Sequence, residues 1–304
     1  GIYFIGMGTA MHAAIDAVYL FDKVNGGGRR RHFFSSVDSS ELHYKHLDED
    51  YLVIAITQSG ETKETLEALR YAKRRGAKTA AIINSPLSSV TESEYSDYVI
   101  FTGSGPEIAV PATKSYIGQI TITRMVNNEW RRILGYPTLN LEQMPTTIDD
   151  VLCQEDKMKA LVDVFCDQEH YFFIGNGINY ATAKEAALKF KEVSYKHGEA
   201  MTGGFLKHGT MSLIDGRSRV FAFVSPTKDI IMTHIDEIKA RDGKIASIGF
   251  DERCTLNLMN SKLVDALSPV PLSVAGHLIA YYYGVKLGND VDRPKSLAKA
   301  VTVL

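Results

Sequence analysis

The stretch IYFIGMGTAMHAAIDAVYLFDKV, residues 2–24, decides the fold because its pattern occurs twice in the chain. A short aromatic and β-branched run is followed by Gly-x-Gly and then by apolar residues three and four apart, the spacing of an amphipathic helix. Gly6 and Gly8 recur 169 residues later as Gly175 and Gly177, in the same setting. The chain therefore contains a duplicated strand–turn–helix unit.

The segments that follow the two copies also correspond. YLVIAITQSGET, residues 51–62, and SRVFAFVSPTKD, residues 218–229, each precede a helical pattern that ends near a glycine and then another apolar run. Runs that are apolar throughout and alternate with helices are typical of parallel sheets covered on both faces. We therefore expect an α/β protein of two tandem doubly wound domains. The first is placed at residues 1–135, and the second, with a helical connector and the C-terminal tail, at residues 136–304.

The composition is that of a globular protein without a marked charge excess. The 304 residues are 45% hydrophobic and 23% charged, with a formal net charge of -2. Neither nucleic acid nor a membrane is an expected partner, since basic excess and long apolar stretches are both missing. Three scattered cysteines support neither disulfides nor a zinc site, so a reducing compartment, the cytoplasm, is expected. The chain begins with Gly1 and runs straight into a strand, which suggests a piece of a longer product.

The loop TQSGET, residues 57–62, lies where a strand is expected to turn into a helix. In parallel α/β sheets, ligands bind at this carboxyl end of the strands. Hydroxyl and amide side chains beside the N–H groups of a helix start favour a phosphate or carboxylate, and Gly60 lets the backbone come close. Capping of the helix by Ser59 or Thr62 explains the same residues. Both interpretations stay open on the loop alone.

The Gly-x-Gly elements also suggest a dinucleotide site. The third glycine of that fingerprint falls on Met11 in the first copy and on Tyr180 in the second. Close packing of each helix on the preceding strand explains both elements more simply. Clusters of metal-ligating residues are also missing from the sequence, so we expect neither a cofactor nor a metal.

Charged residues recur along the helix predicted near residues 183–197. Their spacing alone indicates a solvated face with i,i+4 ion pairs. They are Glu185, Lys189, Glu192 and Lys196. A glycine-rich loop follows and carries His208, a side chain type that titrates near neutral pH.

Three motifs, in order along the chain, carry a family resemblance. They are TQSGETKETL at residues 57–66, KFKEVSYKHGEAMTGGFLKHG at 189–209 and DVDRPKSLAKAVTV at 290–303. Together they resemble the tandem sugar isomerase (SIS) domain family, and more closely the isomerase half of the glutamine–fructose-6-phosphate amidotransferases, the glucosamine-6-phosphate synthases. The resemblance covers the whole chain and implies two SIS domains in a homodimer, with a possible N-terminal glutaminase domain outside this sequence.

The resemblance implies a role for each matching position. The sugar phosphate would be held by one loop, consisting of Thr57, Gln58, Ser59 and Thr62, while Thr9 and Val110 line the same pocket. Glu192 would move a proton between sugar carbons 1 and 2, with Lys189 beside it. His208, entering from the partner subunit, would open the sugar ring. Lys299 would form a Schiff base with the open-chain ketose, which makes the neighbouring proton more acidic.

Some positions depart from the synthase pattern. Ala10 and Ala112 stand where serines are usual, and Phe205 stands where glutamate is usual. The segment GPEIAVPATKS, residues 105–115, is similar to free-standing SIS enzymes. The main expectation is the synthase isomerase domain, which makes glucosamine 6-phosphate from fructose 6-phosphate and ammonia. A free-standing glucosamine-6-phosphate deaminase or other phosphosugar isomerase is the alternative, and a non-catalytic sugar-phosphate sensor is a third.

Overall fold

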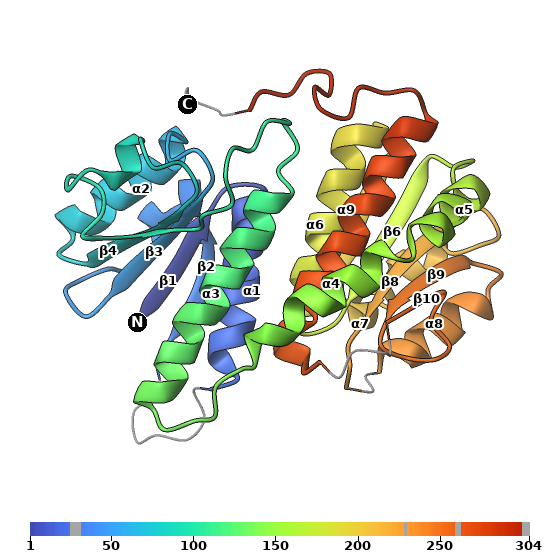
Figure 1. Cartoon of the computed structure of the whole chain (residues 1–304), viewed down its shortest axis with the longest axis horizontal. Helices are drawn as coiled ribbons and strands as arrows, with labels where there is room; N and C mark the ends of the chain where they lie inside the picture. Colours follow the sequence, from blue (N-terminus) through green and yellow to red (C-terminus); the bar gives the residue numbers. More distant parts are fainter. Residues whose placement is uncertain (25–31, 228–229, 259–262, 300–304) are drawn as a thin grey trace. The chain divides into compact units, whose positions relative to one another are not determined.

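The computed structural model describes residues 1–24, 32–227, 230–258 and 263–299. The chain divides into two compact units, Gly1–Leu139 with the chain end from Ser296, and Asn140–Lys295. Each unit holds one parallel five-stranded sheet with helices on both faces (Figure 1), so the tandem α/β architecture is confirmed. The division lies near the expected boundary at residue 135. The chain end groups with the first unit, where Lys299 hydrogen-bonds to the carbonyl of Ala109.

The first sheet has the strand order β2-β1-β3-β4-β5. Its strands are β1 (Ile2–Gly6), β2 (Phe34–Asp38), β3 (Leu52–Thr57), β4 (Lys78–Ile83) and β5 (Tyr98–Phe101). Helices α1 (Thr9–Asp22) and α3 (Lys114–Ile133) pack together on one face, and α2 (Lys63–Arg74) covers the other (Figure 1). From β1 the chain adds β2 on one side and then β3 on the other, so the order of the parallel strands reverses between β1 and β3. Ligands of such folds bind beyond the carboxyl ends of the strands at this point.

The second sheet has the strand order β10-β9-β8-β6-β7. Read from β7, this is the same arrangement as in the first sheet read from β2. Its strands are β6 (His170–Gly175), β7 (His197–Met201), β8 (Arg219–Val224), β9 (Lys244–Gly249) and β10 (Leu256–Asn257). Helices α6 (Asn179–Ser194) and α9 (Pro269–Lys286) pack side by side, and α8 (Ile231–Lys239) packs on β8 and β9. The connector is helical as predicted, with α4 (Met144–Leu152) and α5 (Glu155–Phe165) against α9. A short helix, α7 (Gly203–Leu206), follows β7.

The Gly-x-Gly elements serve helix packing, as predicted. A Cβ atom on Gly6 would lie 2.6 Å from the backbone carbon of Ala10, and one on Gly175 would lie 2.1 Å from the carbonyl oxygen of Asn179. Only glycine lets each helix approach its strand so closely. Gly8 and Gly177 both have φ of 54°, so the turn is the same in the two copies.

A buried ion pair joins the two helices on one face of the first sheet. The guanidinium of Arg124 on α3 binds both carboxylate oxygens of Asp16 on α1, at 2.8 and 2.9 Å, and both side chains are fully buried. Two parallel charge-assisted hydrogen bonds fix relative orientation as well as distance. Loss of either partner would leave a buried charge without compensation, so this pair sets how α1 lies against α3.

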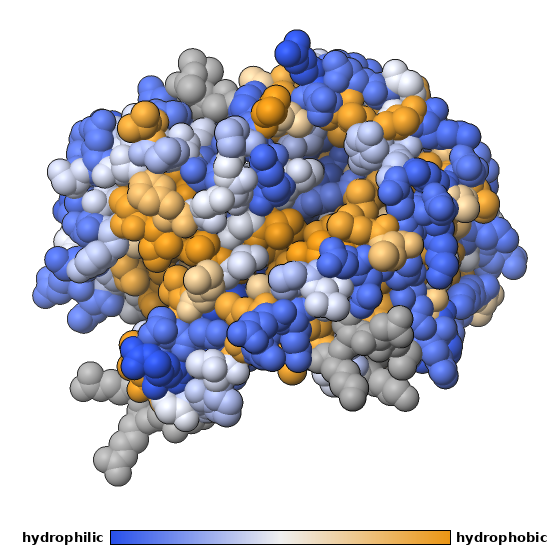
Figure 2. Space-filling view, in the orientation of Figure 1, coloured by the Kyte–Doolittle hydropathy of each residue, from blue (hydrophilic) through white to orange (hydrophobic). Residues whose placement is uncertain are grey.

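The surface mixes polar and apolar side chains. Figure 2 shows polar residues over much of the drawn face with hydrophobic patches between them, the usual composition of a globular protein's exterior. Within the described ranges, no helix combines the length and the apolar character needed to cross a membrane.

Candidate active site

The loop after β3 forms a tight turn around Gly60. The Thr57 hydroxyl, buried at the end of β3, accepts a hydrogen bond from the Gly60 N–H at 3.2 Å, and the Ser59 hydroxyl accepts one from the Glu61 N–H at 3.2 Å. Gly60 has φ of +73°, and a Cβ there would lie 2.4 Å from the Ser88 hydroxyl. The turn therefore requires glycine both for its backbone conformation and for space.

Helix capping does not account for the hydroxyls of this loop. Thr62 is the residue before α2, yet its side chain makes no capping hydrogen bond, and Ser59 bonds within the turn instead. The capping interpretation of these two side chains is therefore wrong. Glu64 lies in the first turn of α2. The start of α2 and the hydroxyl-rich turn before it therefore still have the features of an anion-binding site.

Hydrogen bonds link this loop to its neighbours at the carboxyl edge of the first sheet. The Ser85 N–H, after β4, donates to the carbonyl of Gln58 at 3.1 Å. The Asn84 side chain donates to the carbonyl of Gly105, after β5, at 2.8 Å. The loops that follow β3, β4 and β5 are thus held together, which supports the placement of a ligand here.

Three further predicted residues, Thr9, Val110 and Lys299, lie in the same unit. Lys299 donates its ammonium hydrogen bond to the carbonyl of Ala109, the residue before Val110, so the tail lysine and Val110 are brought together. Thr9 is the first residue of α1, directly after the Gly8 turn at the carboxyl end of β1. Thr9, Val110 and the loop after β3 therefore all follow the carboxyl ends of strands in this sheet.

The second unit holds a buried cluster of charged side chains on α6. Lys189 Nζ lies 2.5 Å from Glu192 Oε2 and 3.7 Å from Glu185 Oε1. From α9, His277 Nε2 lies 3.6 Å from the same Glu185 oxygen. Side-chain exposure is 0% for Glu185, 3% for Lys189 and 17% for Glu192, so Glu192 is the member of the cluster that water or a substrate can reach.

The environment of Glu192 changes its acidity. Burial raises the pKa of this carboxyl group, and the Lys189 ammonium lowers it. The carboxylate of Glu185 raises the pKa further, whereas His277 lowers it, and the net direction is upward. A carboxylate with a raised pKa is a stronger base than an ordinary one, which suits proton abstraction from carbon.

The prediction of a solvated face on this helix is wrong. Lys189 bridges two carboxylates within the protein, and Lys196 pairs with Glu169 and not with Glu192. Sequence analysis also missed His277. A histidine in the largely apolar first half of α9 was the available sign, because a buried histidine requires a polar partner.

His208 and Glu192 lie beyond opposite ends of β7. α6 ends at Ser194, shortly before β7 begins, so Glu192 is near the strand's start. His208 follows the strand's other end, in an exposed turn where its N–H bonds to the carbonyl of Phe205. Among the described residues, no hydrogen bond or ion pair joins His208 to Glu192.

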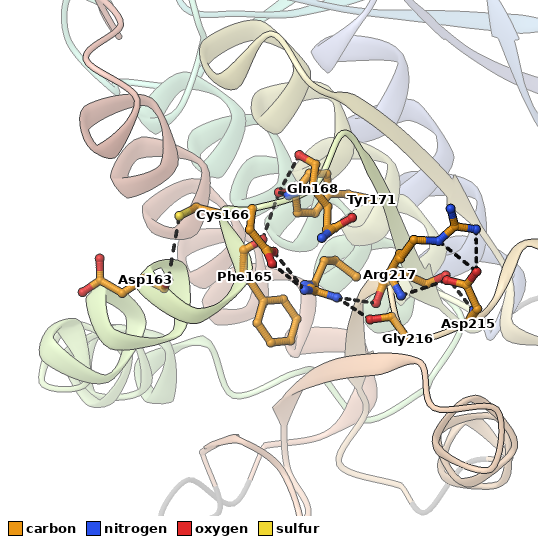
Figure 3. Close-up of polar contacts among 11 residues, drawn as sticks. Asp163, Phe165, Cys166, Gln168, Tyr171, Asp215, Gly216 and Arg217 are labelled. Atoms are coloured by element: carbon orange, nitrogen blue, oxygen red, sulfur yellow. Dashed lines mark hydrogen bonds and ion pairs between the residues drawn. The ribbon is translucent and has the colours of Figure 1, made fainter.

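A cavity lies at the strand-start end of the second sheet. This cavity of about 620 Å³ contains none of the predicted site residues in its lining. Two of its carboxylates are paired: Asp215 binds Arg217, also in the lining, at 2.8 Å (Figure 3), and Asp167 binds the neighbouring Arg219 at 2.9 Å. These contacts brace the edge of the sheet.

Both copies of the duplicated unit match one family model. The SIS domain model matches residues 1–127 and 165–252, which is more than half of the chain. The chain belongs to the SIS domain family. Within this SIS protein, the matched ranges contain the loop after β3 and the helix that carries Glu192.

Relatives of this SIS protein carry consistent names. A curated protein of Methanococcus maripaludis, named glutamine–fructose-6-phosphate aminotransferase [isomerizing], is 41% identical over 99% of the chain, and the chain spans 51% of that relative. The solved structure of the C-terminal domain of glucosamine-fructose-6-phosphate aminotransferase from Francisella tularensis is similar, with a TM-score of 0.84 and 29% sequence identity. The match covers 96% of this chain and 86% of that one. The structure of glucosamine-6-phosphate deaminase from Thermotoga maritima, at 20% identity, has the same fold, with a TM-score of 0.82. That match covers 99% of this chain and 90% of the deaminase chain.

Proposed function

We propose that this chain is the isomerase domain of a glucosamine-6-phosphate synthase, which makes glucosamine 6-phosphate from fructose 6-phosphate and ammonia. The buried contact of Lys189 with Glu192 carries the proposal, because it provides a basic carboxylate where a proton must move between carbons. The names of the relatives support the same reaction.

The chemistry assigns one task to each group. The loop from Thr57 to Thr62 and the pocket residues Thr9 and Val110 hold the phosphate end, which contributes orientation. The Lys299 amine condenses with the ketone at carbon 2, releases water and is then displaced by ammonia. Glu192 removes the proton from carbon 1 to give an enolamine and returns it to carbon 2. Carbon 1 becomes the aldehyde, and the amino group stays on carbon 2.

The ammonia is proposed to come from a glutaminase domain of the same polypeptide. The chain spans about half the length of its Methanococcus maripaludis relative, whose name includes glutamine. We place the reaction in the cytoplasm, because Cys153, Cys166 and Cys254 are all free thiols.

We propose further that the protein is a homodimer in which His208 serves the partner's site. Glu192 precedes β7 and His208 follows it in an exposed turn, where a second chain could reach it, which supports this arrangement. Phe205 and Leu213, on either side of His208 in the sequence, are 63% and 61% exposed. Large apolar side chains that flank an exposed histidine are typical of a surface that another chain covers.

Product analysis tests the function. The chain is incubated with fructose 6-phosphate, with and without ammonium, and separately with glucosamine 6-phosphate. Formation of glucosamine 6-phosphate that requires ammonium supports the synthase domain. The deaminase alternative, favoured by the segment at residues 105–115, predicts that release of ammonia from glucosamine 6-phosphate dominates. Binding of both sugars without any product would contradict both catalytic functions and support a sensor.

A further inference from the structure

The charge balance of the cluster on α6 raises a question that the proposed roles leave open. Glu185 and Glu192 are two carboxylates that share a single ammonium, Lys189. Glu185 is fully buried, so its charge needs compensation more than the charge of the partly exposed Glu192 does. If Lys189 compensated Glu185 alone, Glu192 would lose the partner that holds it in its ionised form.

His277 lies where it can add to the compensation of the Glu185 carboxylate. Its Nε2 is 3.6 Å from Glu185 Oε1, a distance typical of an ion pair and too long for a hydrogen bond. The ring is 8% exposed, so the interaction is little screened by water. Lys189, by contrast, is closer to Glu192 than to Glu185, by 2.5 against 3.7 Å.

The packing of two helices fixes this arrangement. α6 and α9 lie side by side (Figure 1), and a Cβ atom on Gly276 would come within 2.9 Å of the Ala186 Cβ. Because Gly276 and Ala186 directly adjoin His277 and Glu185 in the sequence, the closest approach of the helices sets the distance between imidazole and carboxylate.

We propose that His277 is a positioning residue that engages the carboxylate of Glu185 and so leaves the ammonium of Lys189 to Glu192. The inference rests on the proposed function, since it assigns His277 a task in the reaction of Glu192. His277 does not touch the substrate in this scheme. It acts through Glu185.

Other titratable groups near α6 do not compete for this task. From α9, Tyr283 packs edge-on against Phe190, and burial raises the pKa of its phenol, so it stays neutral. From β6, Tyr171 also faces Phe190, and burial raises its pKa to about 12. After burial, the strongest influences on the pKa of Glu192 come from Lys189, Glu185 and His277.

The acid limb of the pH profile of kcat/KM tests the inference, because this limb reports the pKa of the base in the free enzyme. Replacement His277→Leu is expected to move the acid limb to higher pH by about one unit, since Lys189 is then shared between two carboxylates. Replacement His277→Gln, which retains a polar hydrogen-bond donor, is expected to move it less. KM for fructose 6-phosphate should stay near that of the unchanged protein, because the proposed phosphate site lies in the other unit.

A double replacement decides whether His277 acts through Glu185. In Glu185→Gln, the competing carboxylate is gone, so the limb is expected to move to lower pH. Addition of His277→Leu to Glu185→Gln should then produce a clearly smaller upward shift, the part that His277 exerts on Glu192 directly. The inference is overturned if His277→Leu raises the limb equally in both backgrounds, or lowers activity at every pH without moving the limb. Replacement His197→Gln, at an exposed histidine of the same unit, is the matched control and should leave the profile unchanged.

Circular dichroism and fructose 6-phosphate binding show whether each variant is folded. Should His277→Leu fail to fold, His277→Gln is compared in the two backgrounds. A shift as large in the Glu185→Gln background as in the otherwise unchanged protein contradicts the inference. Inactivity of the unchanged protein in all assays would instead contradict the proposed function. The two failures are therefore distinguishable.

Discussion

Lys189 Nζ contacts Glu192 Oε2 at 2.5 Å, one helical turn apart on α6, and the pair is almost enclosed by protein. A surface pair of this spacing contributes little, because water screens it. Here burial raises the pKa of Glu192 while the ammonium opposes the rise. The pair therefore sets the basicity of a carboxylate that remains 17% exposed, and the first two predictions concern its two members.

Replacement Glu192→Gln is expected to abolish turnover and to preserve substrate binding. The amide cannot accept a proton from carbon, and general base catalysis contributes about 10²–10⁴-fold. The phosphate is proposed to bind in the other unit, so affinity for fructose 6-phosphate should change little. Product formation and titration calorimetry measure the two quantities. Turnover close to that of the unchanged protein would remove Glu192 from the mechanism.

Replacement Lys189→Met is expected to move the acid limb of kcat/KM to higher pH. The limb marks the pH below which Glu192 is protonated and inactive as a base. The Lys189 ammonium lowers the pKa of Glu192, so its removal raises that pKa further, by about 1–3 units for a charge at this distance. Replacement Lys191→Met, at an exposed lysine of the same helix, is the control and should leave the limb in place. A downward shift in Lys189→Met would contradict the assigned electrostatics.

Replacement Gly60→Ala is expected to destabilise the first unit and weaken sugar-phosphate binding. Alanine at φ of +73° costs about 1–3 kcal/mol, and its methyl group would collide with Ser88 and Ile83. Denaturant unfolding and calorimetry measure the losses of stability and affinity. Gly103→Ala is the control, because φ there is also positive but the space is open. Gly103→Ala should lose stability without losing affinity. Equal losses of affinity in both variants would argue against the phosphate loop.

Much of the fold could be predicted from local patterns. The apolar runs, the Gly-x-Gly turns and the glycines after helices recur in both copies, and each reflects a constraint within a few residues. The buried pair of Asp16 and Arg124 could not be predicted in this way, because its partners are 108 residues apart in the sequence. Such contacts depend on how two helices meet on one face of the sheet.

The candidate site was less accessible to sequence reasoning. Helical spacing placed Lys189 and Glu192 on one face but gave no indication that the face is covered by α9, so the residues resembled a solvated surface. The partnership of Glu185 with His277 depends on that same contact between helices. The loop after β3 was correctly located at a strand's carboxyl end, whereas the bonding of its hydroxyls required the turn's geometry.

The separation of His208 from Glu192 leads to a prediction about mixed subunits. Glu192→Gln and His208→Ala are each expected to be inactive as separate proteins. If His208 serves the partner's site, a heterodimer contains one site with both native residues and one with neither. Exchange of subunits in an equal mixture makes half of the dimers heterodimers, so about a quarter of the native activity should return. Exchange is followed independently with two different fluorescent labels. Complete exchange without recovered activity would show that His208 and Glu192 act within one chain or that His208 is dispensable, and the activity of His208→Ala alone separates these two outcomes.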